Sequence, residues 1–170
     1  DMAGIASKIT PDTKMALIQR SRGYSMRNPL SISEIEEICA EVHRVKPDCV
    51  CFVDNCYGEF VDTREPVQVG ADIMAGSLIK NPGGGISLTG GYIAGKDELV
   101  ELASYRLTSP GMGDELGASL ANNRMIFQGF FMAPHVVAQA IKGAVFAAGL
   151  FEKLGYKTLP LPTDLRGDII

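Results

Sequence analysis

Residues 53–85 read VDNCYGEFVDTREPVQVGADIMAGSLIKNPGGG, and the rest of the chain is best interpreted outward from this stretch. It opens with an acid, Asp54, at the end of the apolar run Cys49–Val53, and it closes with Lys80 shortly before three consecutive glycines. Each charged residue stands where an apolar run meets a loop. Open α/β sheets bind their ligands outside the carboxyl ends of the strands. We therefore expect Asp54 and Lys80 to belong to one ligand site.

The residues before this stretch predict a β-α-β unit. Lys14–Gln19 and Cys49–Val53 have the pattern of buried strands, and a helix over about 33–45, capped by Ser31 or Ser33, is expected between them. A crossover of this length implies that the two strands are parallel and that the connection between them is right-handed.

The remaining pattern predicts an α/β protein with a mostly parallel sheet flanked by helices. We expect a helical turn over 2–9, a short strand over 71–75 and a strand that returns from the lysine loop over 86–94. Three further helices are predicted, over about 97–106, 114–129 and 133–154, and a linker from Gly155 onward.

Composition argues against several classes of protein. Apolar residues make up 46% of the chain, charged residues 21%, and the net charge is −4, so there is no basic stripe for nucleic acid. No apolar run approaches the ~20 residues of a membrane span. The four cysteines lie without a CxxC pair, which favours buried thiols in a reducing cytoplasm over a disulfide or a metal site.

A lysine at a strand end in a glycine-rich setting can lose its proton and attack a carbonyl group as an amine nucleophile. Pyridoxal phosphate needs such a lysine, an acid that keeps its pyridine nitrogen protonated, and hydroxyl and backbone N–H groups for its phosphate. Lys80, Asp54, Ser77 and the glycines supply each requirement. Each signal is weak alone, because acids at strand ends are commonly caps and lysines near glycines are commonly solvated. Only their combination carries weight.

This combination resembles the fold-type I pyridoxal-phosphate enzymes of cysteine and methionine metabolism. Their VDN…GAD…S-x-x-K pattern is matched by Val53–Asn55, Gly70–Asp72 and Ser77 with Lys80. Two further stretches, IQRSRGY (18–24) and SLIKNPGGG (77–85), resemble the narrower group of methionine γ-lyase-like or cystathionine β-lyase-like proteins called aluminium resistance proteins. The likeness extends over essentially all 170 residues.

The resemblance implies a role for each matched residue. Lys80 would form the Schiff base with the cofactor and then move protons at the substrate carbons. Asp54 would pair with the pyridinium nitrogen, and Ser77 would bind the phosphate. Tyr57 occupies the place where related aminotransferases have a tyrosine that hydrogen-bonds the cofactor, although the lyases usually lack it. Ile79 also departs from the lyases, which tend to have a hydroxyl residue just before the lysine.

Other candidate residues can be explained either by a role in the site or by an ordinary structural role. Arg22 and Tyr24 follow a strand and are expected either to contact the cofactor or to serve packing and subunit contacts. His43 and His135 are interpreted as structural, and no metal site is expected. Residues 1–155 would form the central part of the cofactor-binding large domain. Residues 156–170 would form a connector toward a small C-terminal domain outside this chain.

The resulting hypothesis is a pyridoxal-phosphate-dependent carbon–sulfur lyase that acts on a sulfur amino acid as its small-molecule substrate. The resemblance also implies a homodimer or homotetramer, without nucleic-acid or membrane partners. Two alternatives stay open: another pyridoxal-phosphate reaction such as transamination, and a non-catalytic α/β interaction module that retains the motif. Carbon–sulfur cleavage depends on the family analogy alone.

Overall fold

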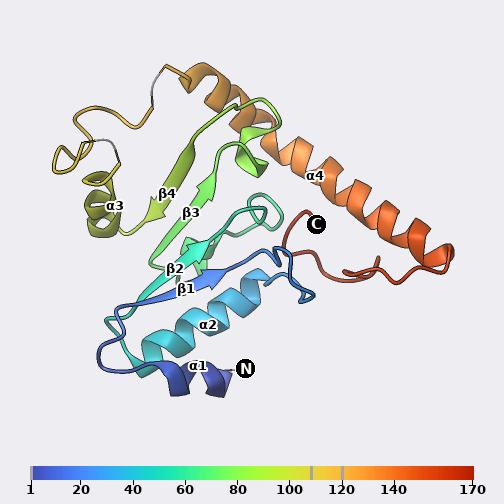
Figure 1. Ribbon diagram of the computed structural model, residues 1–170, viewed down its shortest axis with the longest axis horizontal. Coiled ribbons are helices and arrows are strands. Elements are labelled where there is room, and N and C mark those ends of the chain that lie inside the picture. The colour runs from blue at the N-terminus through green and yellow to red at the C-terminus, as the bar shows by residue number, and fades with distance from the viewer. Residues whose placement is uncertain (1, 108, 120) are drawn as a thin grey trace.

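The computed structural model describes residues 2–107, 109–119 and 121–170. Its centre is a four-stranded sheet of β1 (Met15–Gln19), β2 (Val50–Asp54), β3 (Ile73–Ser77) and β4 (Gly91–Gly95), in that spatial order (Figure 1). The first three strands are parallel, and β4 runs antiparallel to β3. The predicted α/β fold with a mostly parallel sheet is confirmed.

Helices and short 3-10 turns flank this sheet. In chain order they are α1 (Met2–Lys8), α2 (Ile32–Val45), the 3-10 turns η1 (Pro66–Val69) and η2 (Asn81–Gly83), α3 (Asp97–Ser104) and α4 (Asn123–Lys153). Ser31 caps α2: its hydroxyl accepts from the Glu34 N–H, and the Glu34 carboxylate accepts from the Ser31 N–H. Ser31 or Ser33 was predicted as the cap of this helix, and Ser31 is the residue that caps it.

The hydrophobic core lies between α2 and one face of the sheet. Ile35, Cys39 and Val42 from α2 are fully buried, as are Cys51 and Val53 from β2. Side chains alternate between the two faces of a strand, so Cys51 and Val53 face the helix together while Phe52 faces away. This packing fixes the position of the strand that ends in Asp54.

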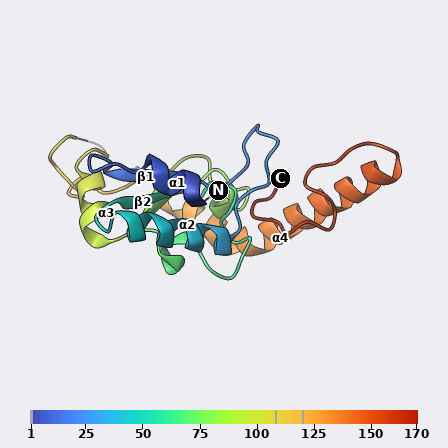
Figure 2. The same cartoon turned by 90° about the horizontal axis from the view of Figure 1, so that it is seen from below.

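The opposite face of the sheet is covered less completely by the described elements. Met15 and Leu17 of β1 and Ile93 of β4 are exposed there. Leu99 and Leu102 of α3 line a hollow together with apolar residues of all four strands on this face. Figure 2 shows α2 and α3 beside the sheet in an edge-on view.

α4 is one continuous helix, so the prediction of two helices over 114–129 and 133–154 is wrong. Residues 114–119 form turns and bends, with Gly117 at φ 74°, and Ala121 also has a positive φ of 64°. Pro134 lies inside α4. A proline removes one helical hydrogen bond but does not end a helix whose neighbours pack, and here Ala133 and Val137 are buried.

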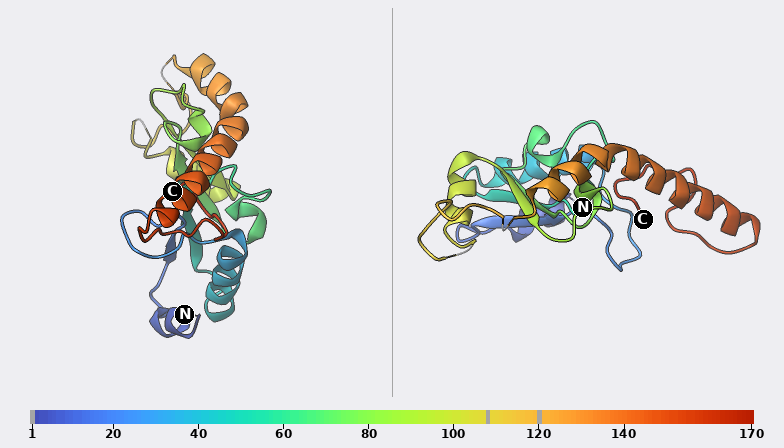
Figure 3. Two further views of the ribbon diagram at one scale, coloured as in Figure 1. Left: turned by 90° about the vertical axis from the view of Figure 1, so that its right-hand side faces the viewer. Right: turned by 90° about the horizontal axis from the view of Figure 1, so that it is seen from above.

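The C-terminal half of α4 extends away from the sheet (Figures 2 and 3). In the described part of the chain, α4 as a whole is the one helix that is long and apolar enough to cross a membrane. Core helices of soluble proteins meet the same criterion. The expectation of no membrane partner stays a prediction.

Two strand boundaries also differ from the sequence prediction. β3 begins at Ile73 rather than Ala71, and β4 covers Gly91–Gly95 rather than 86–94. The residues before β4 cannot extend it, because Gly84, Gly85 and Gly90 adopt positive φ values of 55°, 74° and 116°. They form instead the loop that follows η2.

The segment 156–170 packs back onto the loop that follows β1 (Figures 1 and 3). Asp168 is fully buried, and its carboxylate accepts hydrogen bonds from the Ser21 hydroxyl at 2.8 Å and from the Arg22 N–H at 3.2 Å. Gly167 lies so close to the Leu30 carbonyl that a Cβ would overlap it. This part of the predicted connector therefore holds the 20–30 loop in place.

Candidate active site

Asp54 and Lys80 lie at the same edge of the sheet. Asp54 is the last residue of β2 and pairs in register with Ala75 of β3. Lys80 follows the end of β3 by three residues and occupies the position just before η2, without a side-chain capping bond. Because β2 and β3 are parallel, their carboxyl ends open on one side, where the sequence predicted the ligand site.

The amine of Lys80 lies over the ring of Tyr57, with Nζ 4.5 Å from the ring centroid. This is a cation–π contact. Tyr57 has a φ of 69° and Phe60 a φ of 62°, conformations that residues with a side chain rarely adopt. Such strain persists only where the surroundings enforce it, and it gathers at functional sites. The loop after Asp54 is thus held in a strained shape that brings Tyr57 to the lysine.

Cys56 joins Asp54 and Lys80, a contact that the sequence interpretation missed. Its N–H donates to the Asp54 carboxylate at 3.1 Å, and its thiol lies close enough to Lys80 for each group to affect the pKa of the other. Burial and the Asp54 carboxylate raise the pKa of Cys56, against the opposing effect of Lys80. The spacing of two residues from the acid could have suggested this contact.

The charge state of Lys80 reflects two opposing effects. Burial alone lowers the pKa of its amine, but the Cys56 thiol, Tyr57 and Asp54 together raise that pKa above its ordinary value. Lys80 is therefore charged at neutral pH in the structure described here. The amine becomes a nucleophile only after it loses a proton, so bound ligand must change this balance.

Ser77 ends β3 on the same side of the sheet. It is half-buried, and its hydroxyl oxygen accepts weakly from the Ile79 N–H at 3.4 Å. Its place on the strand that leads to Lys80 suits a phosphate ligand, but the predicted phosphate contact stays a prediction.

Arg22 is engaged elsewhere. Its guanidinium donates to the carbonyls of Leu159 and Ser25 and lies 3.6 Å from the Met26 sulfur. Tyr24 is fully exposed. The contacts of Arg22 thus join the 20–30 loop to the C-terminal segment, and its predicted contact with a cofactor stays a prediction.

α4 meets the lysine loop backbone to backbone. A Cβ on Gly84 would overlap the Gly129 carbonyl, and a Cβ on Gly129 would overlap the Gly83 carbonyl. Phe60 packs edge-on against Phe130 of α4, with ring centroids 5.3 Å apart. α4 therefore supports both loops of the site, the one after Asp54 and the one after Lys80.

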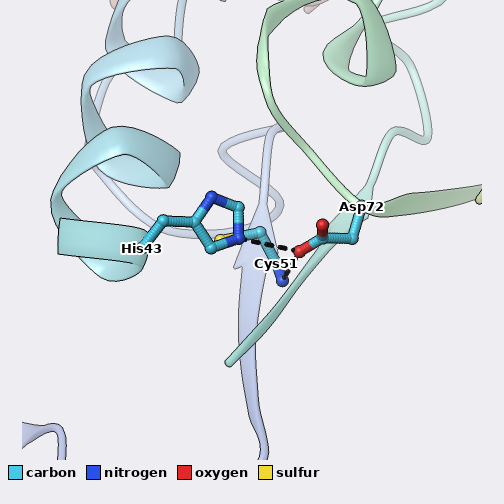
Figure 4. Close-up of side chains that lie close together, drawn as sticks. All are labelled: His43, Cys51 and Asp72. Atoms are coloured by element: carbon cyan, nitrogen blue, oxygen red, sulfur yellow. Dashed lines mark hydrogen bonds and ion pairs between the residues drawn. The ribbon is translucent and has the colours of Figure 1, made fainter. Parts of the chain in front are cut away.

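A second polar cluster lies at the other end of the strands (Figure 4). The buried Asp72 carboxylate accepts from His43 Nε2 at 2.9 Å, from the Cys51 N–H at 2.7 Å and from Lys96 Nζ at 2.8 Å. Burial raises its pKa, but Lys96, Cys51 and His43 outweigh that effect and lower the pKa below its usual value.

The ligand atoms of His43, Cys51 and Asp72 lie within 4.8 Å of one another, a spacing that a metal ion could use. The contacts of Asp72 join α2 and β2 to Lys96, which lies between β4 and α3. The structural role expected of His43 and the expected absence of a metal site stay predictions. All four cysteines lie among the described residues and are free thiols.

The residues at the Asp54–Lys80 edge fit pyridoxal phosphate. An acid fixed by a backbone N–H, a half-buried amine and a strand-end hydroxyl are present on one side of the sheet, on strands held by a packed core. With a mostly parallel sheet and helices beside it, these features are those of the central part of the large domain of a fold-type I pyridoxal-phosphate-dependent transferase.

The family is narrower. A family described as methionine gamma-lyase matches residues 1–170, so the chain belongs to the methionine gamma-lyase family. The uncharacterised protein YnbB of Bacillus subtilis is 54% identical over 170 residues, which cover all of this chain and 40% of that protein. The chain thus spans about two fifths of the length of this relative.

Solved structures agree with this assignment. The crystal structure of a proposed cystathionine beta-lyase involved in aluminium resistance, from Listeria monocytogenes, matches with a TM-score of 0.96 and 56% identity, over 100% of this chain and 42% of that one. A methionine gamma lyase from Micromonospora echinospora, CalE6, matches with a TM-score of 0.62 and 18% identity, over 87% of this chain and 38% of that one. The second likeness concerns the fold alone.

Proposed function

We propose that this chain forms the lysine-and-acid part of a pyridoxal-phosphate-dependent carbon–sulfur lyase that acts on a sulfur amino acid. The observation that carries the proposal is the arrangement of Asp54 and Lys80 on one sheet edge, with the Lys80 amine 4.5 Å from the Tyr57 ring centroid. Membership of the methionine gamma-lyase family supports the same reaction class.

Each residue has a definite task in this proposal. Lys80 would hold the cofactor through its amine, and the same amine would take the proton from the α carbon of the substrate and return it at a neighbouring carbon. Asp54 keeps the ring nitrogen protonated, and the Cys56 N–H orients its carboxylate. When bound, pyridoxal phosphate supplies the electron sink that makes the α proton removable. Ser77 binds its phosphate and Tyr57 its phenolic oxygen.

The substrate class follows from relatives rather than from geometry. The Listeria protein is described as a proposed cystathionine beta-lyase, and the family bears the name of methionine gamma-lyase. Both names refer to the cleavage of a carbon–sulfur bond in an amino acid. We therefore propose that a thiol leaves from the β or γ carbon of the substrate.

Transamination is the second candidate, and Tyr57 favours it. A tyrosine three residues after the acid is typical of the aminotransferases that the sequence resembles, and here its ring contacts the lysine. Products separate the two reactions, because elimination releases a thiol and transamination does not.

The first experiment tests cofactor capture by Lys80. The full-length protein is incubated with pyridoxal phosphate, reduced with borohydride and digested, and the modified peptide is identified by mass spectrometry. We expect the mass of the reduced cofactor on Lys80 in wild type and its loss from that peptide in Lys80→Arg. Unlabelled wild-type Lys80, or a folded Lys80→Arg variant that binds the cofactor equally well, would support the non-catalytic interaction module instead.

The second experiment tests the reaction. Wild type and Lys80→Arg are incubated with methionine, cystathionine or cysteine, and keto acid and thiol are measured together. Equal amounts of both, absent from Lys80→Arg, are expected for the lyase. Keto acid without thiol would assign transamination.

The setting of the reaction completes the proposal. We expect a cytoplasmic homodimer or homotetramer without nucleic-acid or membrane partners, which sedimentation analysis and cell fractionation check. A monomer at micromolar concentration, or a membrane-bound protein, would contradict this part while leaving the reaction untouched.

A further inference from the structure

A buried hydrogen-bond network lies directly behind the candidate active site. Arg20 is 1% exposed, and its Nη1 donates to Asn55 Oδ1 at 2.8 Å and to Glu65 Oε2 at 3.4 Å. Asn55 Nδ2 is within 2.9 Å of Glu65 Oε2 and 3.1 Å of the Tyr92 hydroxyl. That hydroxyl donates in turn to Glu59 Oε1 at 2.9 Å. The loop after β1, the loop after β2 and β4 are thereby joined.

The charges in this network do not balance if both carboxyl groups are ionised. Arg20 supplies one positive charge, whereas Glu59 and Glu65 would supply two negative ones. Burying an uncompensated charge is costly, so the network favours one retained proton. The question is which carboxyl group holds it.

The donors identify that group. Glu65 accepts from Arg20, from Asn55 and from the Phe60 N–H at 3.0 Å, contacts that stabilise a carboxylate. Glu59 is 4% exposed, and among the described side chains it accepts only from Tyr92 on Oε1, while Oε2 is buried without a partner among the described residues. The proton therefore belongs on Glu59.

The same residue touches both sides of the active site. Asn55 follows Asp54 in sequence and is joined to Glu59 through Tyr92. Asn81 follows Lys80, and its Nδ2 donates to the Glu59 carbonyl oxygen at 3.0 Å. The Glu59 carboxyl group also lies against β3, because a Cβ on Gly76 would overlap Oε1. One residue thus holds the neighbours of the acid and of the lysine.

The unpaired atoms of the network agree with a proton on Glu59. Glu59 Oε2 and Asn81 Oδ1 are buried acceptors without a partner in the described part of the chain, and Arg20 Nε is a buried donor without one. An ionised Glu59 would leave its negative charge on an unpaired buried oxygen, which is costly in a protein interior.

We propose that Glu59 holds a proton in the folded protein up to about neutral pH and acts as a positioning residue that sets the relative placement of Asp54 and Lys80. The positioning half rests on the proposed function, and the protonation half does not. Glu59 touches neither reacting atoms nor cofactor in this scheme. Its carboxyl group acts through Tyr92 and Asn55, and its main-chain carbonyl holds Asn81.

The electrostatic surroundings agree. Burial raises the pKa of Glu59 to about 7, assisted by Glu65 and opposed by its backbone hydrogen bond, Tyr92 and Arg20. Asp62 also faces Arg20 and acts on the guanidinium. The pKa of Tyr92 is raised, by burial and by Glu59, so its phenol remains neutral. Because the folded pKa of Glu59 exceeds its ordinary value, the folded state holds this proton more tightly than the unfolded state.

Infrared spectroscopy tests the protonation directly. In the full-length protein without cofactor we expect the carbonyl-stretch band of a buried protonated carboxyl group below pH ~7, and its loss as the pH rises through that value. The band should be absent from Glu59→Gln and unchanged in Glu101→Gln, a control at an exposed carboxyl group. In Glu65→Gln the band should vanish at lower pH, because Arg20 then needs Glu59 as its counter-charge.

Cofactor affinity tests the positioning. Glu59→Gln keeps a donor in a group of the same shape, so its affinity for pyridoxal phosphate should stay within about twofold of wild type, whereas Glu59→Leu and Tyr92→Phe should lose about five- to thirtyfold. Wild-type affinity should fall further than that of Glu59→Gln as the pH rises through ~7, an effect that a purely structural role would not produce. Circular dichroism confirms that each variant is folded.

The outcomes separate the two proposals. Wild type without the band below pH ~7, or Glu59→Gln with it, overturns the protonation. If Glu59→Gln binds pyridoxal phosphate as weakly as Glu59→Leu does, the positioning role is wrong. The same holds if the affinity of Glu59→Gln depends on pH as that of wild type does. Wild type that shows the band but takes up no cofactor on Lys80 refutes the proposed function and the positioning that rests on it, and leaves the protonation standing.

Discussion

The ammonium group of Lys80 lies 4.5 Å from the centre of the Tyr57 ring, and this contact joins the two loops that follow β2 and β3. Tyr57 reaches the lysine only because its backbone adopts a φ of 69°. The strained loop therefore places Tyr57 at the lysine before any ligand binds. The buried network around Glu59 contacts this loop, and so does α4 through Phe130.

Removing the Tyr57 ring should make Lys80 easier to deprotonate. A cation–π contact of this kind is worth about 0.5–1 kcal/mol and favours the charged amine. In Tyr57→Leu, labelling of Lys80 by an amine-selective reagent below its pKa should be about two- to fivefold faster than in wild type. Tyr57→Phe keeps the ring and should label like wild type. The measurement is peptide mass spectrometry on cofactor-free full-length protein, and equal rates in wild type and Tyr57→Leu would contradict it.

Gly129 should be required where α4 meets the lysine loop. Its substitution by alanine forces a Cβ into the Gly83 carbonyl, and we expect Gly129→Ala to destabilise the protein by about 1–3 kcal/mol and to reduce cofactor capture by Lys80. Gly143 lies in the same helix with open space around it, so Gly143→Ala should stabilise by about 0.5–1 kcal/mol. Urea unfolding measures both, and similar effects of the two variants would refute the close contact.

The Asp72 cluster should stabilise the fold in a pH-dependent way. Its contacts with Lys96, the Cys51 N–H and His43 lower the pKa of Asp72 below the ordinary value, despite burial. The stabilisation is therefore complete above the ordinary aspartate pKa and is lost as the pH falls through the lower folded value.

We expect Asp72→Asn to lose about 2 kcal/mol of stability at neutral pH and to differ less from wild type at about pH 3. Asp12→Asn, at an exposed position, is the matched control and should unfold like wild type. The free energy of unfolding from urea titrations at both pH values decides the question. If the free energy of unfolding differs between Asp72→Asn and wild type by the same amount at both pH values, the ion pairs of Asp72 do not account for the stabilisation.

Ser31 and Ser33 should differ sharply in their effect on α2. Ser31→Ala removes the hydroxyl that accepts from the Glu34 N–H and should cost about 0.5–2 kcal/mol. The Ser33 hydroxyl lies 3.1 Å from that of Ser31 without capping the helix, and Ser33→Ala should cost less than about 0.5 kcal/mol. Thermal unfolding of the two variants side by side is sufficient, and an equal loss in both would show that Ser31 does not cap α2.

The shared position of Asp54 and Lys80 could be predicted from the sequence, because apolar strands that end in polar loops of a parallel sheet open on the same side. The helix after Ser31 was predictable for a similar reason, since caps and apolar periodicity are local signals. The length of α4 was not, because whether Pro134 ends a helix depends on packing beyond its neighbours.

The sequence alone thus determined the order of the four strands and of the helices as far as α3, the acid and the lysine of the site, and the family that their spacing resembles. These features depend on neighbouring residues and on alternation, which a linear chain displays directly. Only the tertiary structure decided that Cys56 comes close to Lys80 and that Glu59 shares one network with Arg20. Such contacts join residues far apart in the chain, and their geometry and charge balance exist only once the loops have packed together.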